Sequence, residues 1–337
     1  MKNYTIDELK DISAHSRKKL KNAGILYLKD LLIFTPKRLA EFAGMSEELA
    51  EKIINKALDF LEKKEKEEFW FKKAGELEEK EEKHRIFLHT GARALDEILG
   101  GGWAAGEVTE LAGEYRSGKS QTCFTAIATA FLPPEEGGLN DGDIGVVIID
   151  SENTFSVKRM EKIFQRFDID PKFAKERIHV GRPKNSIHQL RMIEKLIKYV
   201  KEWNVKLIIV DSLTKHPRAD FSGRKELYDR QRIILSMVEK LRRMAISYNI
   251  VVLTTNQVVA VPNAAPYKGR TIAPIGGHVL AHNVDTRLML FVVSEKKNTR
   301  KARIIDSSWL PPGEAYIKIT DAGITDVESD EEEEEGV

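Results

Sequence analysis

The chain has 337 residues, of which 42% are hydrophobic and 32% are charged, and this composition suits one large domain together with a small one. No stretch is long and apolar enough to span a membrane, and the first residues form no apolar signal segment, so we expect a cytoplasmic protein with no membrane partner. The single cysteine, Cys123, excludes an internal disulfide and is expected to be a small buried residue in a reducing compartment.

The charge is unevenly distributed along the chain. The formal net charge is +1, but residues 326–337 hold eight acidic side chains and no basic ones. Without this segment 54 basic residues stand against 45 acidic ones, a net charge of +9, which is compatible with a polyanionic partner. We interpret residues 327–337 as an acidic disordered tail that aids solubility. Competition with nucleic acid for the basic surface is the less favoured role.

Residues 1–62 are predicted to form a small domain of short amphipathic helices. Gly24 suits the end of one helix, and Thr35-Pro36 suits the start of another. The segment Ala43-Gly44-Met45 is an apolar–glycine–apolar hairpin between two helices, which can point backbone amides at a phosphate. From the residues alone, this role and plain packing of a helical bundle are equally favoured.

Residues 63–85 form a charge-rich linker that contains the aromatic run Phe69-Trp70-Phe71. A segment this charged cannot easily bury three aromatic rings within its own fold, so we expect them to dock on another surface. One interpretation is that these rings pack on the large domain of the same chain. The more specific interpretation is that they dock on a neighbouring subunit.

A full G-x-x-x-x-G-K-S pattern occupies residues 113–120, here called the phosphate loop. A strand-like stretch, 107–112, precedes it, and a stretch with helical spacing, 121–131, follows it. In this context glycines let backbone amides turn toward phosphates, Lys119 reaches the β- and γ-phosphates, and the Ser120 hydroxyl can bind Mg²⁺. The pattern therefore predicts a nucleotide site, and a chance glycine-rich turn is the weak alternative.

Residues 86–326 alternate strand and helix, which predicts an α/β fold with a mostly parallel central sheet. Helical stretches separate three apolar runs that are typical of buried parallel strands, and later segments look like an antiparallel extension. The runs are 145–150, 205–211 and 250–256, the helices include 187–203 and 225–249, and the extension comprises 286–293, 302–306 and 315–319.

Hydrolysis of a bound nucleotide needs a metal carboxylate, a residue that activates water and a sensor of the γ-phosphate. Asp211 ends a predicted strand at the Walker B position, which favours a role in holding the metal. The alternative is a structural role as a helix cap or turn residue. Glu152 follows another strand end, where active sites of open α/β sheets gather, and is our candidate for the water-activating base. Gln257 follows the third strand and could touch the γ-phosphate.

Together these residues resemble the family of archaeal RadA and eukaryotic Rad-type recombinases, relatives of bacterial RecA. The resemblance covers nearly the whole chain. It rests on motifs in a fixed order, namely Thr90-Gly91, 99–102, the phosphate loop, 132–139, 150–155, 210–214, 255–258 and 274–278.

The resemblance implies a RecA-like P-loop ATPase core, 86–326, and a helix-hairpin-helix N-terminal domain, 1–62. It also implies a filament on single-stranded DNA that performs homologous pairing and strand exchange with ATP and Mg²⁺. Lys119, Glu152 and Gln257 would serve catalysis, with Gln257 as a γ-phosphate switch, and Ser120 and Asp211 would hold the metal. The nucleotide-binding set would be Gly113, Glu114, Tyr115, Arg116, Ser117, Gly118, Lys119, Ser120, Gln121, Arg159, Pro274 and His282.

Within that set, the resemblance implies that Arg159 lies against the adenine and that His282 senses the γ-phosphate across a subunit interface. Phe71 and Ala74 match the family's F-x-x-A polymerisation motif, in the linker where the family has it. This match implies that Phe71 fills a pocket on the next subunit, in agreement with the docking expected of the aromatic run.

The loops that would contact DNA depart from the family in places. Positions for backbone phosphate contacts are matched by Arg218, Arg224 and Arg230. Lys225 stands where the family usually has glycine. The lysine keeps or adds positive charge. In the second loop, 258–273, Arg270-Thr271 replaces an Asp-Pro whose acidic residue helps to cap ATP across the interface. The segment Ile12-Ser13-Ala14-His15 also lacks the glycine of the first hairpin.

Our main hypothesis is an ATP-dependent DNA recombinase, a DNA-dependent ATPase that binds single- and double-stranded DNA as a homo-oligomeric filament or ring. The alternative is a recombinase paralogue that acts as a mediator of another RadA-like recombinase, without strand exchange of its own. The altered second loop supports this alternative. A hexameric helicase of the same superfamily is weaker, because the polymerisation motif and the hairpin domain argue against it.

Overall fold

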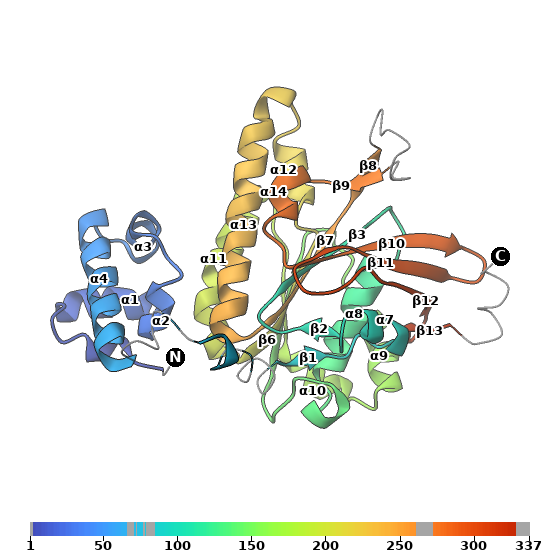
Figure 1. The fold of residues 1–337 in the computed structure, drawn as a ribbon, viewed down its shortest axis with the longest axis horizontal. Coiled ribbons are helices and arrows are strands. Elements are labelled where there is room, and N and C mark those ends of the chain that lie inside the picture. The colour runs from blue at the N-terminus through green and yellow to red at the C-terminus, as the bar shows by residue number, and fades with distance from the viewer. Residues whose placement is uncertain are drawn as a thin grey trace. The chain divides into compact units, whose positions relative to one another are not determined.

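The computed structural model describes residues 3–65, 71, 73–76, 78, 85–260 and 272–327. The aromatics Phe69 and Trp70, the segment Arg270-Thr271 and the acidic tail after residue 327 lie outside the described residues. The chain forms two compact units, one of Met1–Arg85 with Lys195–Glu202 and one of Ile86–Glu194 with Trp203–Val337. Figure 1 shows the elements of both.

The first unit is helical, and its helices begin and end where the local sequence predicts. Ser13 caps the first helix by accepting a hydrogen bond from the Ser16 amide at 3.0 Å, and Gly24 follows its end with φ +83°. Gly44 ends a later helix in the left-handed conformation, with φ +65°. A core of buried aliphatic side chains holds the helices together. The elements are η1 (Ile6–Glu8), α1 (Ala14–Asn22), α2 (Leu28–Leu31), α3 (Pro36–Ala43) and α4 (Glu47–Glu65).

The second unit is built on a nine-stranded sheet whose order is β13-β12-β11-β10-β3-β7-β6-β4-β5. The strands from β10 to β5 are parallel, and β11 to β13 extend the sheet in antiparallel fashion. The predicted α/β fold with a mostly parallel sheet is confirmed. The bounds are β3 (Val108–Gly113), β4 (Gly145–Asp150), β5 (Ile178–Gly181), β6 (Val205–Asp211), β7 (Val251–Asn256), β10 (Thr286–Ser294), β11 (Thr299–Ser307), β12 (Glu314–Thr320) and β13 (Gly323–Asp326).

One strand differs from the prediction. We expected β10 to belong to an antiparallel extension, but it pairs parallel with β3 and antiparallel only with β11. The reason is the long connection from β7 to β10, because a crossover of this length allows the chain to re-enter the sheet in the same direction.

Helices cover both faces of the sheet, with α8 packed on one face and α13 against the other (Figure 1). Two short pairs, β1–β2 and β8–β9, lie outside the large sheet. The remaining elements are β1 (Phe87–Leu88), α7 (Arg93–Ile98), β2 (Trp103–Ala104), α8 (Lys119–Ala130), η2 (Pro134–Glu136), α9 (Val157–Arg166), α10 (Pro171–Arg177), α11 (Ser186–Glu202), α12 (Lys215–Asp220), η3 (Arg224–Glu226), α13 (Leu227–Tyr248), β8 (Val258–Ala260), β9 (Ile272–Pro274) and α14 (Gly277–Ala281).

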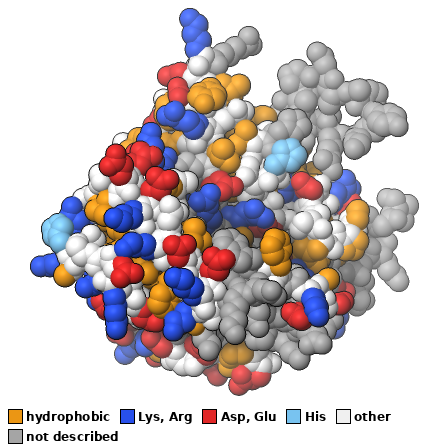
Figure 2. All heavy atoms as spheres, turned by 60° about the vertical axis from the view of Figure 1, so that its left-hand side comes forward, with side chains coloured by type: hydrophobic (Ala, Val, Ile, Leu, Met, Phe, Trp, Pro, Cys, Tyr) orange, Lys and Arg blue, Asp and Glu red, His pale blue; other side chains and the backbone are white. Residues whose placement is uncertain are grey.

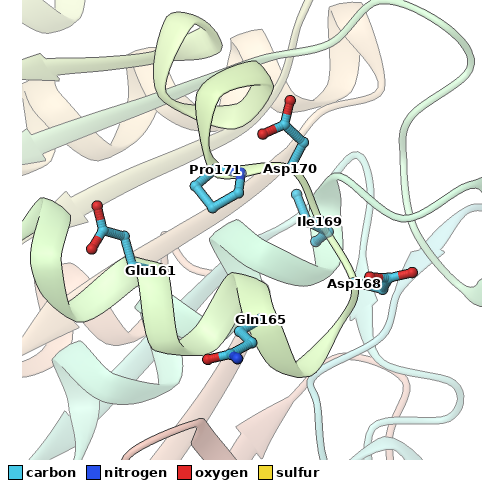
Figure 3. A pocket seen from close by; sticks show the side chains of 6 residues that line it. All are labelled: Glu161, Gln165, Asp168, Ile169, Asp170 and Pro171. Carbon is cyan, nitrogen blue, oxygen red and sulfur yellow. The ribbon is translucent and has the colours of Figure 1, made fainter.

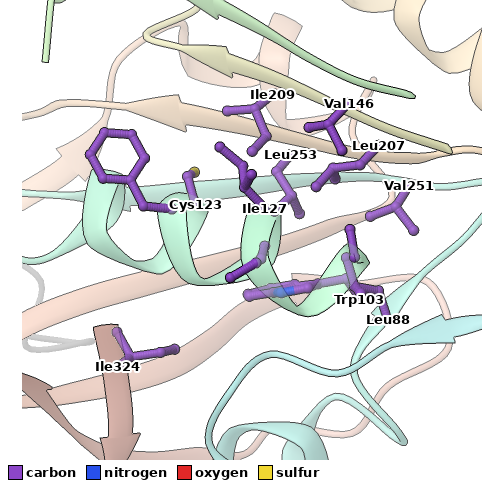
Figure 4. Close-up of a cluster of buried hydrophobic side chains, with 14 of the residues drawn as sticks. Leu88, Trp103, Cys123, Ile127, Val146, Leu207, Ile209, Val251, Leu253 and Ile324 are labelled. Carbon is purple, nitrogen blue, oxygen red and sulfur yellow. The ribbon is translucent and has the colours of Figure 1, made fainter. Parts of the chain in front are cut away.

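The core between the sheet and α8 fixes the helix that follows the phosphate loop. Figure 4 shows Cys123 and Ile127 of α8 facing apolar side chains of β4, β6 and β7, among them Leu207 and Leu253. Burial raises the pKa of the Cys123 thiol well above its ordinary value, so this side chain is neutral core packing. Among the described residues, no helix has both the length and the apolar character that a membrane span requires.

Candidate nucleotide site

The phosphate loop joins β3 to α8 in a tight backbone turn. Gly118 has φ +102° and directly precedes α8, and Arg116 also has a positive φ, +62°. A Cβ atom added at Gly113 would lie 2.4 Å from Ser117 Oγ and 2.6 Å from the Leu290 carbonyl oxygen. The Ser117 hydroxyl and the Leu290 backbone therefore lie too close to Gly113 for any side chain, so this position requires glycine.

Lys119 lies across the loop. Its ammonium donates to the carbonyl oxygens of Gly113 at 2.9 Å and Glu114 at 2.7 Å, and to Ser117 Oγ at 3.3 Å. Burial lowers the pKa of Lys119, while the nearby carboxylates of Asp211 and Glu152 oppose this shift. A cation that is partly desolvated among neutral acceptors is well suited to bind phosphate oxygens.

Asp211 ends β6 and lies in register with Asp150 at the end of β4. Its carboxylate accepts hydrogen bonds from Thr255 Oγ1 at 2.5 Å and from Thr154 Oγ1 at 3.2 Å. The following peptide bond, to Ser212, is cis. Two hydroxyls thus orient a buried carboxylate, which together with the Ser120 hydroxyl could supply the oxygen ligands that Mg²⁺ prefers.

Glu152 lies in the turn after β4, and Asp150 holds that turn in place. The Asp150 carboxylate accepts from the backbone amides of Thr154 at 3.0 Å and Phe155 at 3.2 Å. Glu152 Oε2 lies 3.5 Å from Lys215 Nζ, while Glu152 Oε1 is buried and has no hydrogen-bond partner among the described residues. A buried carboxylate oxygen without a partner leaves its capacity to accept a hydrogen bond unused.

Gln257 follows β7 and forms hydrogen bonds to two other segments, α12 and the residue after β9. Its side-chain oxygen accepts from Arg218 Nη1 at 3.1 Å, and its backbone oxygen accepts from the Ile275 amide at 2.9 Å. The structure therefore brings a candidate γ-phosphate sensor into contact with a candidate DNA ligand on α12.

A buried polar network lies beneath these residues. The amide nitrogen of Asn256 donates to Glu110 Oε1 and to the Ile275 carbonyl oxygen, each at 2.6 Å, and its side-chain oxygen accepts from Thr214 Oγ1 at 2.7 Å. Glu110 also forms an ion pair with Arg287. Because Asn256 and Glu110 are completely buried, this network ties β3, β7 and the start of α12 into one rigid group.

Arg159 lies on α9 at the edge of the site. Its guanidinium donates to Gln121 Oε1 at 2.9 Å, to Asp321 at 3.2 Å and to the Thr320 carbonyl oxygen. The contact with Gln121 places Arg159 against the first turn of α8. Tyr115 is 80% exposed, with the Arg116 guanidinium 5.5 Å from its ring centre.

Other predicted residues lie on separate elements. Pro274 ends β9, and His282 lies exposed in the turn after α14. Lys225 is exposed in η3, Arg224 begins that element, and Arg230 Nη1 approaches the Phe221 carbonyl oxygen at 3.5 Å. Both residues of the F-x-x-A pair are exposed: Phe71 is 87% exposed, and Ala74 follows it by three residues.

Sequence reasoning missed several side chains that shape the site. Glu110 could have been predicted from the sequence, because an acidic residue inside a strand next to a phosphate loop needs a buried partner. Thr154, Thr255 and Lys215 could not have been, because their contacts depend on which strands are neighbours in the sheet.

A pocket of about 550 Å³ lies elsewhere, at the end of α9 and the start of α10 (Figure 3). Three of its lining side chains are the carboxylates Glu161, Asp168 and Asp170, and none is basic. An acidic lining repels phosphate, so this pocket is not a nucleotide site. On the face in Figure 2 basic and acidic side chains are interspersed.

Comparison with known proteins agrees with this geometry. A family model described as Rad51 matches residues 81–327. The DNA repair and recombination protein RadA of Ignicoccus hospitalis is 36% identical over 326 residues, an alignment that covers 96% of each chain. The resemblance inferred from the motifs is confirmed. The chain belongs to the Rad51 family, as a RadA/Rad51-type recombinase of the RecA superfamily.

Proposed function

We propose that this protein is an ATP-dependent DNA recombinase that assembles on single-stranded DNA and promotes homologous pairing and strand exchange. The observation that carries the proposal is the arrangement of two carboxylates around Lys119: Glu152, two residues after β4, and Asp211, at the end of the neighbouring strand β6, both influence the charge of the Lys119 ammonium. Nucleotide binding alone needs no such group, whereas hydrolysis does. The name of the relative from Ignicoccus supports a role in DNA repair and recombination.

The side chains divide the chemical work as follows. Lys119 exchanges its loop carbonyls for phosphate oxygens, and Ser120 and Asp211 supply ligands for Mg²⁺, which would neutralise part of the phosphate charge. Glu152 orients a water molecule and accepts its proton as general base. Gln257 senses the γ-phosphate and passes the change to Arg218 and Ile275, its two hydrogen-bond partners.

DNA would be held by the basic side chains around α12 and η3. Arg218, Arg224, Lys225 and Arg230 are our proposed contacts to backbone phosphates. Single-stranded binding should weaken steeply with added salt, because each phosphate contact releases counterions.

Assembly would proceed through the linker, 63–85. Phe71 exposes an aromatic ring to solvent, as a side chain that docks on a neighbouring copy must do. A neighbour would then bring His282 and Pro274 to the nucleotide. For residues 1–62 we propose a helix-hairpin-helix domain, in which the Gly44 turn between α3 and α4 is the candidate phosphate-facing hairpin.

The experiment is ATP hydrolysis measured with and without single-stranded DNA, combined with electron microscopy of the same mixtures at low salt. We expect hydrolysis that DNA stimulates and filaments that require both ATP and DNA. Lys119→Ala serves as the matched control, because it removes the phosphate-binding cation and should abolish both signals. Wild-type protein that hydrolyses no ATP and forms no filament would overturn the proposal.

A further inference from the structure

We infer that Lys215 is a positioning residue that ties Glu152 to α12, so that ATP hydrolysis responds to the loop beyond that helix. The inference rests on the proposed function, since it concerns the residue proposed as general base. Lys215 is the first residue of α12, and the phosphate-loop pattern gives it no role.

Lys215 contacts the turn that carries Glu152 at two points. Lys215 Nζ donates to the Ser151 carbonyl oxygen at 2.6 Å and lies 3.5 Å from Glu152 Oε2. A backbone acceptor and the adjacent carboxylate thus share one ammonium. Because Lys215 contacts only Oε2, the acceptor capacity of Glu152 Oε1 stays unused.

The start of α12 is anchored, so the reach of Lys215 is set by the fold. Thr214 Oγ1 donates to Asn256 Oδ1 at 2.7 Å, and the Leu213 amide donates to the Thr255 carbonyl oxygen at 3.1 Å. Gln189 Nε2 donates to the Ser212 carbonyl oxygen at 3.2 Å. The partners lie on two elements, β7 and α11, and they hold the residues just before Lys215 in place.

The same helix reaches the second proposed hydrolysis residue. Arg218, one turn after Lys215, donates to Gln257 Oε1 at 3.1 Å. After the helix the chain enters the segment of η3 and Arg230, the proposed DNA contacts. One six-residue helix therefore contacts Glu152 at its first residue and Gln257 one turn later, directly before the proposed DNA loop.

Arg218 has one hydrogen-bond partner in Gln257 and a second, proposed partner in DNA. A DNA phosphate binds guanidinium through charge-assisted, often bidentate hydrogen bonds, which are stronger than a bond to a neutral amide oxygen. DNA would therefore draw Arg218 away from Gln257 and rotate α12 about its anchored start. Because Lys215 directly follows the anchored residues, this rotation would change the direction of its side chain and so adjust the Ser151–Glu152 turn that its ammonium contacts.

The ion pair itself adds little to folding. The Lys215 side chain is 37% exposed and that of Glu152 is 24% exposed, so solvent screens the interaction. Removing the lysine should leave the fold intact and change only the coupling between the helix and the base.

The test compares Lys215→Ala, Lys215→Gln and Lys215→Arg with wild type, measuring kcat and KM for ATP with and without single-stranded DNA. We expect Lys215→Ala to lower the ratio of DNA-stimulated to DNA-free kcat by about tenfold and to leave KM within about twofold, because ground-state binding is untouched. Lys215→Arg, which can reach both acceptors, should restore most of the ratio. Lys215→Gln should give an intermediate ratio, since it keeps a donor but not the charge.

The matched control is Lys172→Ala, which removes an exposed lysine of α10, and it should behave as wild type. Unchanged DNA stimulation in Lys215→Ala, or no rescue by Lys215→Arg, would overturn the inference while the proposed function stands. Wild-type protein without DNA-stimulated hydrolysis would instead refute the proposed function. Should Lys215→Ala fail to fold, the comparison of Lys215→Gln with Lys215→Arg decides the same question.

Discussion

Replacing Asn256 with aspartate would remove both amide donors from the polar network under the ATP site while changing almost no volume. The two bonds that Asn256 donates, to Glu110 and to the Ile275 carbonyl oxygen, are both 2.6 Å long and lie around a completely buried side chain. An acceptor left without a donor in such a place cannot turn to water. The substitution therefore exposes the full cost of desolvation.

The magnitude follows from the two orphaned acceptors. Losing a hydrogen bond to the charged Glu110 costs about 1.5–3 kcal/mol, and leaving the Ile275 carbonyl unsatisfied costs about 1–3 kcal/mol. We expect the free energy of unfolding to fall by about 2.5–6 kcal/mol, a large part of the roughly 5–15 kcal/mol that stabilises an ordinary protein, and the repulsion between the new carboxylate and Glu110 adds to this loss.

Urea unfolding followed by tryptophan fluorescence measures this loss, because Trp103 is completely buried in the core between the sheet and α8. Asn140→Asp is the control, since the Asn140 amide donates a single bond, to the Phe131 carbonyl oxygen at 3.2 Å, at a partly buried position. The control should lose about 1 kcal/mol. A loss in Asn256→Asp no larger than in the control would refute the network as described.

Three further predictions concern the base, the linker and a titrating pair. Glu152→Gln should lower kcat for ATP hydrolysis by about 10²–10⁴-fold while ATP still binds, which single-turnover kinetics and a nucleotide-binding assay measure; unchanged kcat would exclude Glu152 as the base. Phe71→Ala should abolish long assemblies in electron microscopy and leave the circular dichroism of the monomer unchanged, and persistent filaments would exclude the polymerisation role. The hydrogen bond to Asp96 raises the pKa of His89 above its ordinary 6.5. The pair of protonated His89 with Asp96 therefore stabilises the fold fully below pH 6.5, and this contribution is lost as the pH rises through the raised pKa. His89→Gln should therefore cost more stability in urea unfolding at about pH 5.5 than at about pH 9, and equal costs would contradict this pair.

The local parts of the site follow from sequence. Glycines at Gly113 and Gly118, a preceding strand and a following helix specify the phosphate loop, because that turn depends on residues close together in the chain. Asp211 is readable in the same way, as a carboxylate at the end of an apolar strand. The structure places both where the pattern predicts them, at the same edge of the parallel sheet.

The non-local parts do not follow. The pairing of Lys215 with Glu152 exists because β4 and β6 are neighbours in the sheet, and strand order cannot be read from either strand. The direction of β10 depends on a long crossover rather than on the composition of the strand, which is why the antiparallel prediction was wrong for it. Asp150 shows the same limit: it ends a strand as Asp211 does, yet its carboxylate caps the turn of Glu152.

Strand exchange by this chain alone is the activity that separates a recombinase from a mediator. The most direct measurement is a strand-exchange assay with purified protein, ATP, Mg²⁺, single-stranded DNA and homologous duplex, with no other recombinase added. We predict joint molecules that require ATP and homology and that disappear in the Lys119→Ala variant. DNA-stimulated ATP hydrolysis without any joint molecules would contradict the account and would instead identify a mediator of another recombinase.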